Sequence, residues 1–170
     1  MDFTHLAEER YSCRLFSNKK VPDCLIEKII EVANLSPTAV NKQPFKIFWM
    51  KSEKAKQVIR KVTRFTFGAD TFLLVGFKNS EGWVRSFDAH NFAETDASIV
   101  ATHMMLEITA LGLATTWVGH FDAPLLQSLY PEMDGYVLTA LFPIGYAADN
   151  AKPSPRHFER KSCEEIVNVL

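Results

Sequence analysis

The spacing of apolar side chains along the chain predicts alternating helices and strands. From Leu25 to Leu35 they recur every three or four positions, which is typical of one face of a helix, and this helix opens at Pro22 and ends before Pro37. Other helices are expected at residues 2–9, 53–62 (capped by Ser52) and 124–129. Aromatic and β-branched residues predict strands at 45–50, 71–77, 115–118 and 136–142.

A longer helix is expected over residues 88–111, ending at Gly112. It is apolar on more than one face, so a sheet could cover only part of it. We therefore expect the rest to be buried in a homodimer interface. His103 within this helix is expected to be a hydrogen-bonded core or interface side chain.

Helices and strands alternate without regular βαβ units, so the predicted class is α+β, with helices packed around one sheet. We expect one domain over residues 1–170, with an irregular C-terminal arm from about residue 146 to 170. Hydrophobic residues make up 47% of the chain and charged residues 23%, as in folded globular proteins.

Charge, cysteines and the N-terminal sequence restrict partners and location. The net charge of −1 argues against bulk attraction to nucleic acid or to anionic membranes. Cys13, Cys24 and Cys163 lie too far apart for a metal motif and are odd in number. Residues 1–5 do not resemble a signal peptide, and the apolar window 97–114 contains His103 and Glu107. We expect a cytoplasmic protein with no membrane or nucleic-acid partner and no metal.

Motifs of several common enzyme classes are missing from the sequence. It contains no GxGxxG, no GxxxxGK[ST], no GxSxG and no HExxH, and its five histidines are scattered. Rossmann, P-loop, hydrolase and zinc-protease chemistry are therefore not indicated.

The first candidate segment is Arg10-Tyr11-Ser12-Cys13-Arg14. If it is extended, Arg10, Ser12 and Arg14 point to one side, where two guanidiniums and a hydroxyl suit a phosphate or polyol. The alternative is a helix end with solvated charges. Cys13 either packs in the interior or has its pKa lowered by its basic neighbour.

The second candidate segment is Ser36-Pro37-Thr38-Ala39-Val40-Asn41-Lys42-Gln43-Pro44-Phe45. The amides of Asn41 and Gln43 both donate and accept, which suits the edge of a heterocycle. The alternative is a helix-to-strand turn with a left-handed Asn.

Two further segments follow the long helix. In the stretch 112–122, Gly119 would let a planar group approach the backbone, although a plain strand end is the alternative. Residues 142–146 lead into a tail with several basic residues between 152 and 161. That tail is either the second half of an anion site or a solvated, proline-stiffened arm.

Taken in this order, RxSxR, SPTAVNKQPF, GLATTWVG and FPIGY with a late RK pair resemble the nitroreductase family of FMN-dependent oxidoreductases. The resemblance spans about residues 9–167. It implies an α+β sandwich, a central and mostly antiparallel sheet surrounded by helices, and an intertwined homodimer with exchanged terminal arms. The FMN would lie at the dimer interface. The sequence departs from the family pattern at Ala114, often Gly, and at Gly119-His120, often an acidic residue followed by Gly.

The resemblance also implies roles for individual residues. FMN phosphate, ribityl and pyrimidine contacts would come from Arg10, Tyr11, Ser12 and Arg14, and a second phosphate contact from Arg160 with Lys161. The partner chain would contribute Pro37, Thr38, Ala39 and Asn41, and Gln43 would be a further ligand. The Gly119 N–H would lie near flavin N5, and the other side of the ring would be lined by Pro143, Ile144 and Gly145. His120 and Phe121 would face the substrate.

The activity implied is hydride transfer from NADH or NADPH, followed by reduction of a nitroaromatic, a quinone or a similar electron-poor acceptor in a ping-pong cycle. The flavin carries the chemistry, so no dedicated acid or base is expected. Two alternatives stay open: a specialised flavin enzyme of the reductive dehalogenase type, and a non-catalytic protein that binds or sequesters flavin.

Overall fold

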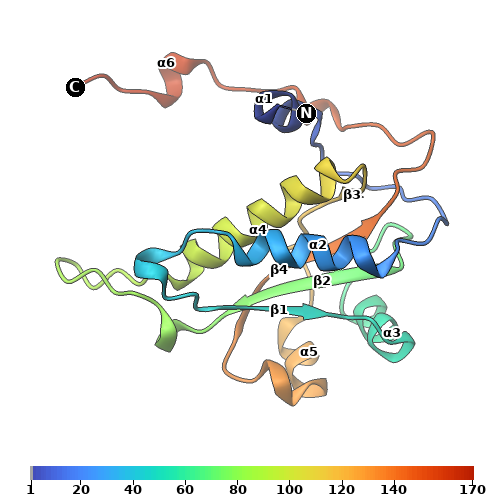
Figure 1. Ribbon diagram of the computed structural model, residues 1–170, viewed down its shortest axis with the longest axis horizontal. Helices are drawn as coiled ribbons and strands as arrows, with labels where there is room; N and C mark the ends of the chain where they lie inside the picture. The colour runs from blue at the N-terminus through green and yellow to red at the C-terminus, as the bar shows by residue number, and fades with distance from the viewer. Residues whose placement is uncertain (1) are drawn as a thin grey trace.

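The computed structural model describes residues 2–170 as an antiparallel sheet with helices on both faces (Figure 1). Its strands run in the order β1-β2-β4-β3. Their bounds are β1 Phe45–Trp49, β2 Thr71–Phe77, β3 Ala114–Thr115 and β4 Val137–Gly145. Ser12 continues the sheet beyond β3 through a single parallel bridge to Thr115. The α+β class and the antiparallel sheet are confirmed.

Two helical layers cover the sheet. Helices α2 (Asp23–Asn34) and α4 (Ala93–Ala110) lie on one face, and α3 (Glu53–Val62) and α5 (Ala123–Leu129) on the other. Shorter elements are α1 Phe3–Glu9, α6 Cys163–Ile166 and the 3₁₀ turns η1 Ala39–Asn41, η2 Asn79–Glu81, η3 Pro131–Met133 and η4 Pro155–His157. Strand β2 serves both layers, because its side chains alternate between the two faces: Leu73 and Val75 face α2 and α4, while Phe72 and Leu74 face α3 and α5.

Three predicted boundaries were wrong. Helix α4 begins at Ala93 rather than residue 88, because residues 84–91 close a hairpin with a bridge between Val84 and Asn91, and Ala89 has a left-handed φ of 56°. Strand β3 ends at Thr115, after which Val118 makes one isolated bridge to Leu141, and β4 extends to Gly145. Leu35, the last position of the predicted apolar stripe, is 79% exposed because it terminates α2.

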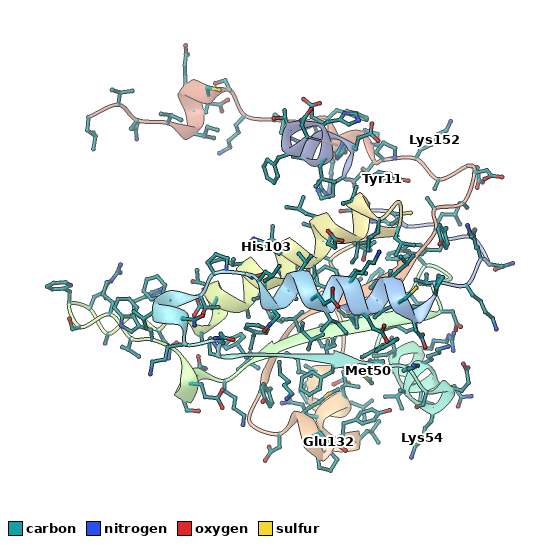
Figure 2. The ribbon with its side chains drawn as sticks, viewed as in Figure 1. Tyr11, Met50, Lys54, His103, Glu132 and Lys152 are labelled. Carbon is teal, nitrogen blue, oxygen red and sulfur yellow. The ribbon has the colours of Figure 1, made fainter. Side chains whose placement is uncertain are left out.

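The long helix α4 keeps one partly open face. Val100, Ala101, Met104 and Ile108 are fully buried against the sheet and α2. Ile99, His103 and Leu106 are only half-buried, and His103 lies above α4 on the side away from the sheet (Figure 2). The His103 Nδ1 lies 2.9 Å from the Ile99 carbonyl oxygen, as expected for a hydrogen-bonded histidine.

After β4 the chain crosses above α4, passes α1 and ends in a mostly exposed arm that contains η4 and α6 (Figure 1). Several of its apolar side chains face solvent, among them Phe158, Ile166, Val169 and Leu170. Over the described chain, no helix has the length and apolar character needed to cross a membrane.

Candidate functional site

A cavity of about 540 Å³ gathers basic side chains from both ends of the chain. Its lining consists of Arg10, Ser12, Arg14, Ser154, Arg156, His157 and Arg160. The predicted group of Arg10, Ser12, Arg14 and Arg160 is therefore brought together. Lys161 is exposed and does not line this cavity.

The extended backbone of residues 12–14 explains why these side chains converge. Ser12 bridges Thr115, and the Cys13 N–H donates to the Thr115 carbonyl oxygen at 2.9 Å. Cys13 points inward and is fully buried, while Arg14 on the opposite side is exposed. The structure thus supports an interior packing position for Cys13, and its thiol donates to the Leu15 carbonyl oxygen at 3.3 Å.

The cavity has an unbalanced positive charge. Within residues 2–170, none of its four guanidiniums forms an ion pair with a carboxylate. Burial and, secondarily, repulsion from Arg160 lower the pKa of Arg10 below its usual value. Like charges held together at a partly buried position favour an anion between them.

Arg156 and His157 were not singled out by the motifs, although they belong to the basic tail that indicated an anion site. The 3₁₀ turn η4 places both at the cavity wall, and the His157 ring packs edge-on against Tyr11, with centroids 6.4 Å apart. Ser154 and Pro155 begin this turn, but Arg156 and His157 reach the cavity only because the arm lies over residues 10–14. The sequence pattern alone could therefore not assign Arg156 and His157 to the site.

Gly119 lies at an open position close to the sheet. The Val118 N–H donates to the Leu141 carbonyl oxygen at 2.9 Å, which fixes the backbone just before Gly119. A Cβ built on Gly119 would meet nothing within 4 Å, so the space beside its backbone is free. The structure therefore leaves room there for a flat ligand.

The residues predicted to line the other side of the flavin ring are buried, whereas Gly119 is open. Pro143, Ile144 and Gly145 are buried within β4, where the Pro143 carbonyl oxygen accepts from the Thr115 hydroxyl at 2.7 Å. A Cβ on Gly145 would come within 3.0 Å of the Phe16 ring. In this chain these residues contact β3 and Phe16.

The loop after α2 forms a compact and partly strained structure. Val40, Asn41 and Gln43 have φ values of 45°, 57° and 51°, so the left-handed Asn expected for a turn is present. The Thr38 hydroxyl accepts from the Gln43 N–H at 3.1 Å, and the Gln43 amide donates to Asn41 Oδ1 at 3.1 Å. Thr38 and Ala39 are half-buried, and Asn41 and Gln43 are exposed.

One chain does not bring this loop to the arginine cavity. The loop is tied to the first turn of α4 through Asp96, whereas residues 12–14 join the chain just after α4 ends. An 18-residue helix is roughly 27 Å long at 1.5 Å per residue. The two predicted halves of the site therefore lie near opposite ends of α4 (Figure 1).

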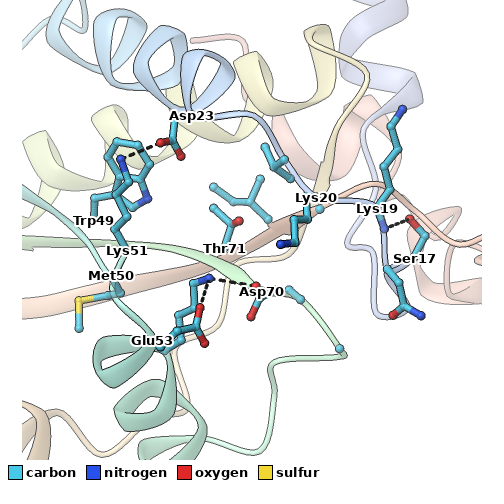
Figure 3. Close-up of a pocket in the computed structure, with 17 residues that line it drawn as sticks. Ser17, Lys19, Lys20, Asp23, Trp49, Met50, Lys51, Glu53, Asp70 and Thr71 are labelled. Atoms are coloured by element: carbon cyan, nitrogen blue, oxygen red, sulfur yellow. Dashed lines mark hydrogen bonds and ion pairs between the residues drawn. The ribbon is translucent and has the colours of Figure 1, made fainter.

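A second cavity, of about 450 Å³, lies between the Ser17–Val21 segment, the start of α3 and the ends of β2 and β4 (Figure 3). Its charges are largely paired: Lys51 contacts Asp23 at 2.7 Å, and Lys56 contacts Glu53 at 2.8 Å and Asp70 at 2.9 Å. Of the predicted site residues only Ile144 and Gly145 line it. Lys19 and Lys20 also line this cavity and form no ion pair within residues 2–170, but the cavity has no cluster of guanidiniums like that of the first.

No group of three or more His, Cys, Asp or Glu side chains is placed to hold a metal ion anywhere in residues 2–170.

Over residues 2–170, the chain is an α+β protein with a cluster of unpaired arginines beside the edge of its sheet. The model of the nitroreductase family matches residues 7–64 and 60–146, and the chain belongs to this family. It is 31% identical to a Clostridium difficile nitroreductase family protein of known structure, with a TM-score of 0.90 over 99% of this chain and 98% of that one.

Two further proteins resemble the chain. A candidate nitroreductase from Exiguobacterium sibiricum, solved in complex with FMN, has the same fold, with a TM-score of 0.84 at 21% identity over 100% of this chain and 98% of that one. A Methanothermobacter thermautotrophicus protein, named as a candidate NADH dehydrogenase/NAD(P)H nitroreductase, is 24% identical over 88% of this chain and 80% of its own length.

Proposed function

We propose that the protein is an FMN-dependent oxidoreductase that uses NADH or NADPH to reduce nitroaromatic, quinone or similar electron-poor acceptors. The observation that carries this proposal is the cavity in which Arg10, Arg14, Arg156 and Arg160 converge without a carboxylate partner. The FMN in the Exiguobacterium structure and the name of the Methanothermobacter protein support the choice of cofactor and donor.

The residues present fit FMN. A phosphate needs several N–H donors and positive charge, and the four guanidiniums and Ser12 supply both. A flat ring needs open backbone, which Gly119 offers. We assign the phosphate to Arg10, Arg14, Arg156 and Arg160, the ribityl chain to Ser12 and Tyr11, and the reactive edge of the ring to the Gly119 N–H.

We further propose that the complete site forms between two copies of the chain. The loop Thr38–Gln43 and the arginine cavity lie near opposite ends of α4, so a two-fold axis that sets two α4 helices antiparallel would bring each loop to the partner's cavity. The half-buried Ile99, His103 and Leu106 give α4 a face for this contact. The exposed apolar side chains of the arm give a second one.

Bound FMN would supply hydride acceptance from the nicotinamide and hydride delivery to the acceptor. The chain's own residues bind and orient. The guanidiniums hold the phosphate end, the Gly119 N–H donates to the ring edge where charge builds up, and His120 and Phe121 face the acceptor. No side chain is required to act as a dedicated acid or base.

The test is the visible spectrum of the purified protein, before and after NADH or NADPH is added without oxygen. A flavin spectrum that bleaches supports the proposal and identifies the preferred donor. Flavin that does not bleach would favour a sequestering protein, and failure to bind added FMN would refute a flavin site. Turnover with halogenated phenols instead of nitroaromatics would indicate the dehalogenase-type alternative.

A further inference from the structure

The segment that follows α3 is fixed to the backbone just beyond Gly119. The Thr63 side chain is buried, and its hydroxyl donates to the His120 carbonyl oxygen at 2.8 Å while accepting from the Phe65 N–H at 3.2 Å. The Asp122 N–H donates to the Val62 carbonyl oxygen at 2.9 Å. Residues 62–65 and 120–122 therefore form one connected unit.

Three side chains stack in series on this unit. The Phe65 ring lies edge-on to the His120 ring, with centroids 5.5 Å apart, and the Arg64 guanidinium carbon lies 5.0 Å from the centre of Phe65. A cation over an aromatic ring is held mainly through its face, so the N–H groups along the guanidinium edge keep their capacity to donate. The stack begins at the residue that follows Gly119.

Arg64 is exposed and forms no ion pair within the described part of the chain. Two of the cations on α3 differ from Arg64 in this respect, because Arg60 and Lys56 both pair with Asp70. The acid in the adjoining segment, Asp122, is engaged as the cap of α5, where its Oδ1 accepts from the Leu125 N–H at 3.0 Å. Arg64 thus presents a positive charge that no acid of the described chain neutralises.

We propose that Arg64, carried on Phe65 and His120, is a binding subsite for the anionic group of an aromatic acceptor. A guanidinium presents a planar pair of donors that matches a carboxylate, while the two rings offer apolar surface to the acceptor's own ring. The subsite selects carboxylated nitroaromatics over neutral ones of the same shape. The inference rests on the proposed function, because it places the reactive edge of the flavin at Gly119.

The test compares unreactive probes that differ in charge but little in shape. Isothermal titration calorimetry measures the dissociation constants of benzoate and benzamide for the FMN-loaded protein, in wild type, Arg64→Gln and Lys61→Gln. Lys61 is the matched control, because it is an exposed cation near Arg64 that lies outside the stack. We expect Arg64→Gln to weaken benzoate binding about fivefold and to leave benzamide unchanged, with Lys61→Gln altering neither.

The same pattern is expected in the KM values of 4-nitrobenzoate and 4-nitrobenzamide. Equal weakening of both probes in Arg64→Gln, or an equal effect of Lys61→Gln on benzoate, would overturn the subsite. Loss of FMN from Arg64→Gln would assign Arg64 to the cofactor, and slower reduction by NADH alone would assign it to the donor's phosphates. A wild-type chain that does not retain FMN would instead refute the proposed function.

Discussion

Asp96 in the first turn of α4 holds the loop after α2 by its backbone. Its Oδ1 accepts from the Ala39 N–H at 2.9 Å across 57 residues of sequence, and the carboxylate is only 2% exposed. Its Oδ2 has no hydrogen-bond partner among the described residues. The loop it fixes contains three non-glycine residues in left-handed conformation, which cost energy unless the surroundings hold them.

Asp96→Ala is expected to release this loop. The Ala39 amide loses a charge-assisted acceptor, so its hydrogen exchange should speed up and FMN should bind more weakly, by about 1.5–3 kcal/mol. Asp96→Asn is the control, because its side-chain oxygen can still accept from Ala39 and should preserve most of the affinity. If FMN binds equally well to wild type and Asp96→Ala, the loop does not take part in the site.

Because Arg10 and Arg160 repel each other, Arg10→Ala is expected to weaken FMN binding without lowering the stability of the flavin-free protein. Arg10→Ala should weaken FMN retention by roughly 1.5–3 kcal/mol, while the free energy of unfolding of the flavin-free protein should stay the same or rise by about 0.5 kcal/mol or less, since solvent screens the repulsion. Equilibrium dialysis with FMN and urea unfolding of the flavin-free protein measure the two quantities.

Arg60→Gln is the matched control for this experiment, because Arg60 pairs with Asp70 at 2.6 Å and lies outside the cavity. It should lower the free energy of unfolding slightly and leave FMN retention unchanged. A lower stability of flavin-free Arg10→Ala would mean that Arg10 serves the fold and not a ligand.

The parts of the fold that local pattern determines were predictable. The period of apolar residues located α2, and the capping residue Ser52 located α3. The aromatic and β-branched runs located β1 and β2 within a residue. The start of α4 was not predictable, because residues 88–92 are drawn into a hairpin by the pairing of Val84 with Asn91, a tertiary contact.

Prediction of the candidate site had the same limit, because tertiary contacts leave no local pattern in the sequence. Arg10, Ser12 and Arg14 could be grouped because an extended strand alternates its side chains, and this convergence is present. Arg156 and His157 join them only because the arm folds back over residues 10–14. The role of Asp96 had no sequence signal at all, because a buried acid that binds a distant backbone amide leaves no local pattern.

Acid should destabilise the protein partly through Asp70. Burial alone would raise its pKa, but the hydrogen bonds and charges of Lys56 and Arg60 outweigh burial and hold the pKa below its usual value. A carboxylate whose pKa is depressed by folding adds stability above its unfolded pKa and loses it as the pH falls through the folded value. The Lys56 pKa is raised by its hydrogen bond to Glu53 and, to a smaller extent, by its hydrogen bond to Asp70. Lys56 is therefore charged at neutral pH, and its ion pair with Asp70 persists there.

Asp70→Asn should therefore lower the free energy of unfolding at pH 7 by about 0.5 kcal/mol, a small value because the carboxylate is half exposed. The difference from wild type should shrink as the pH falls below the usual range of an aspartate. Urea unfolding between pH 7 and pH 2.5 measures it. A difference that is constant over this range would show that the ion pairs do not account for the loss.

If each site is shared between two chains, two variants that each bind FMN poorly should form one complete FMN site in a mixed dimer. Asn41→Ala damages the loop and Arg10→Ala damages the cavity, so each variant alone should retain little FMN. In a mixed dimer, the intact cavity of the first chain meets the intact loop of the second, and one site is complete.

Mixing after partial unfolding and refolding should therefore restore up to a quarter of the wild-type FMN content, since half the dimers are mixed and each has one good site of two. The double variant Arg10→Ala/Asn41→Ala mixed with itself should restore none. If loop and cavity acted within one chain, mixing would restore nothing, because neither chain has both halves intact.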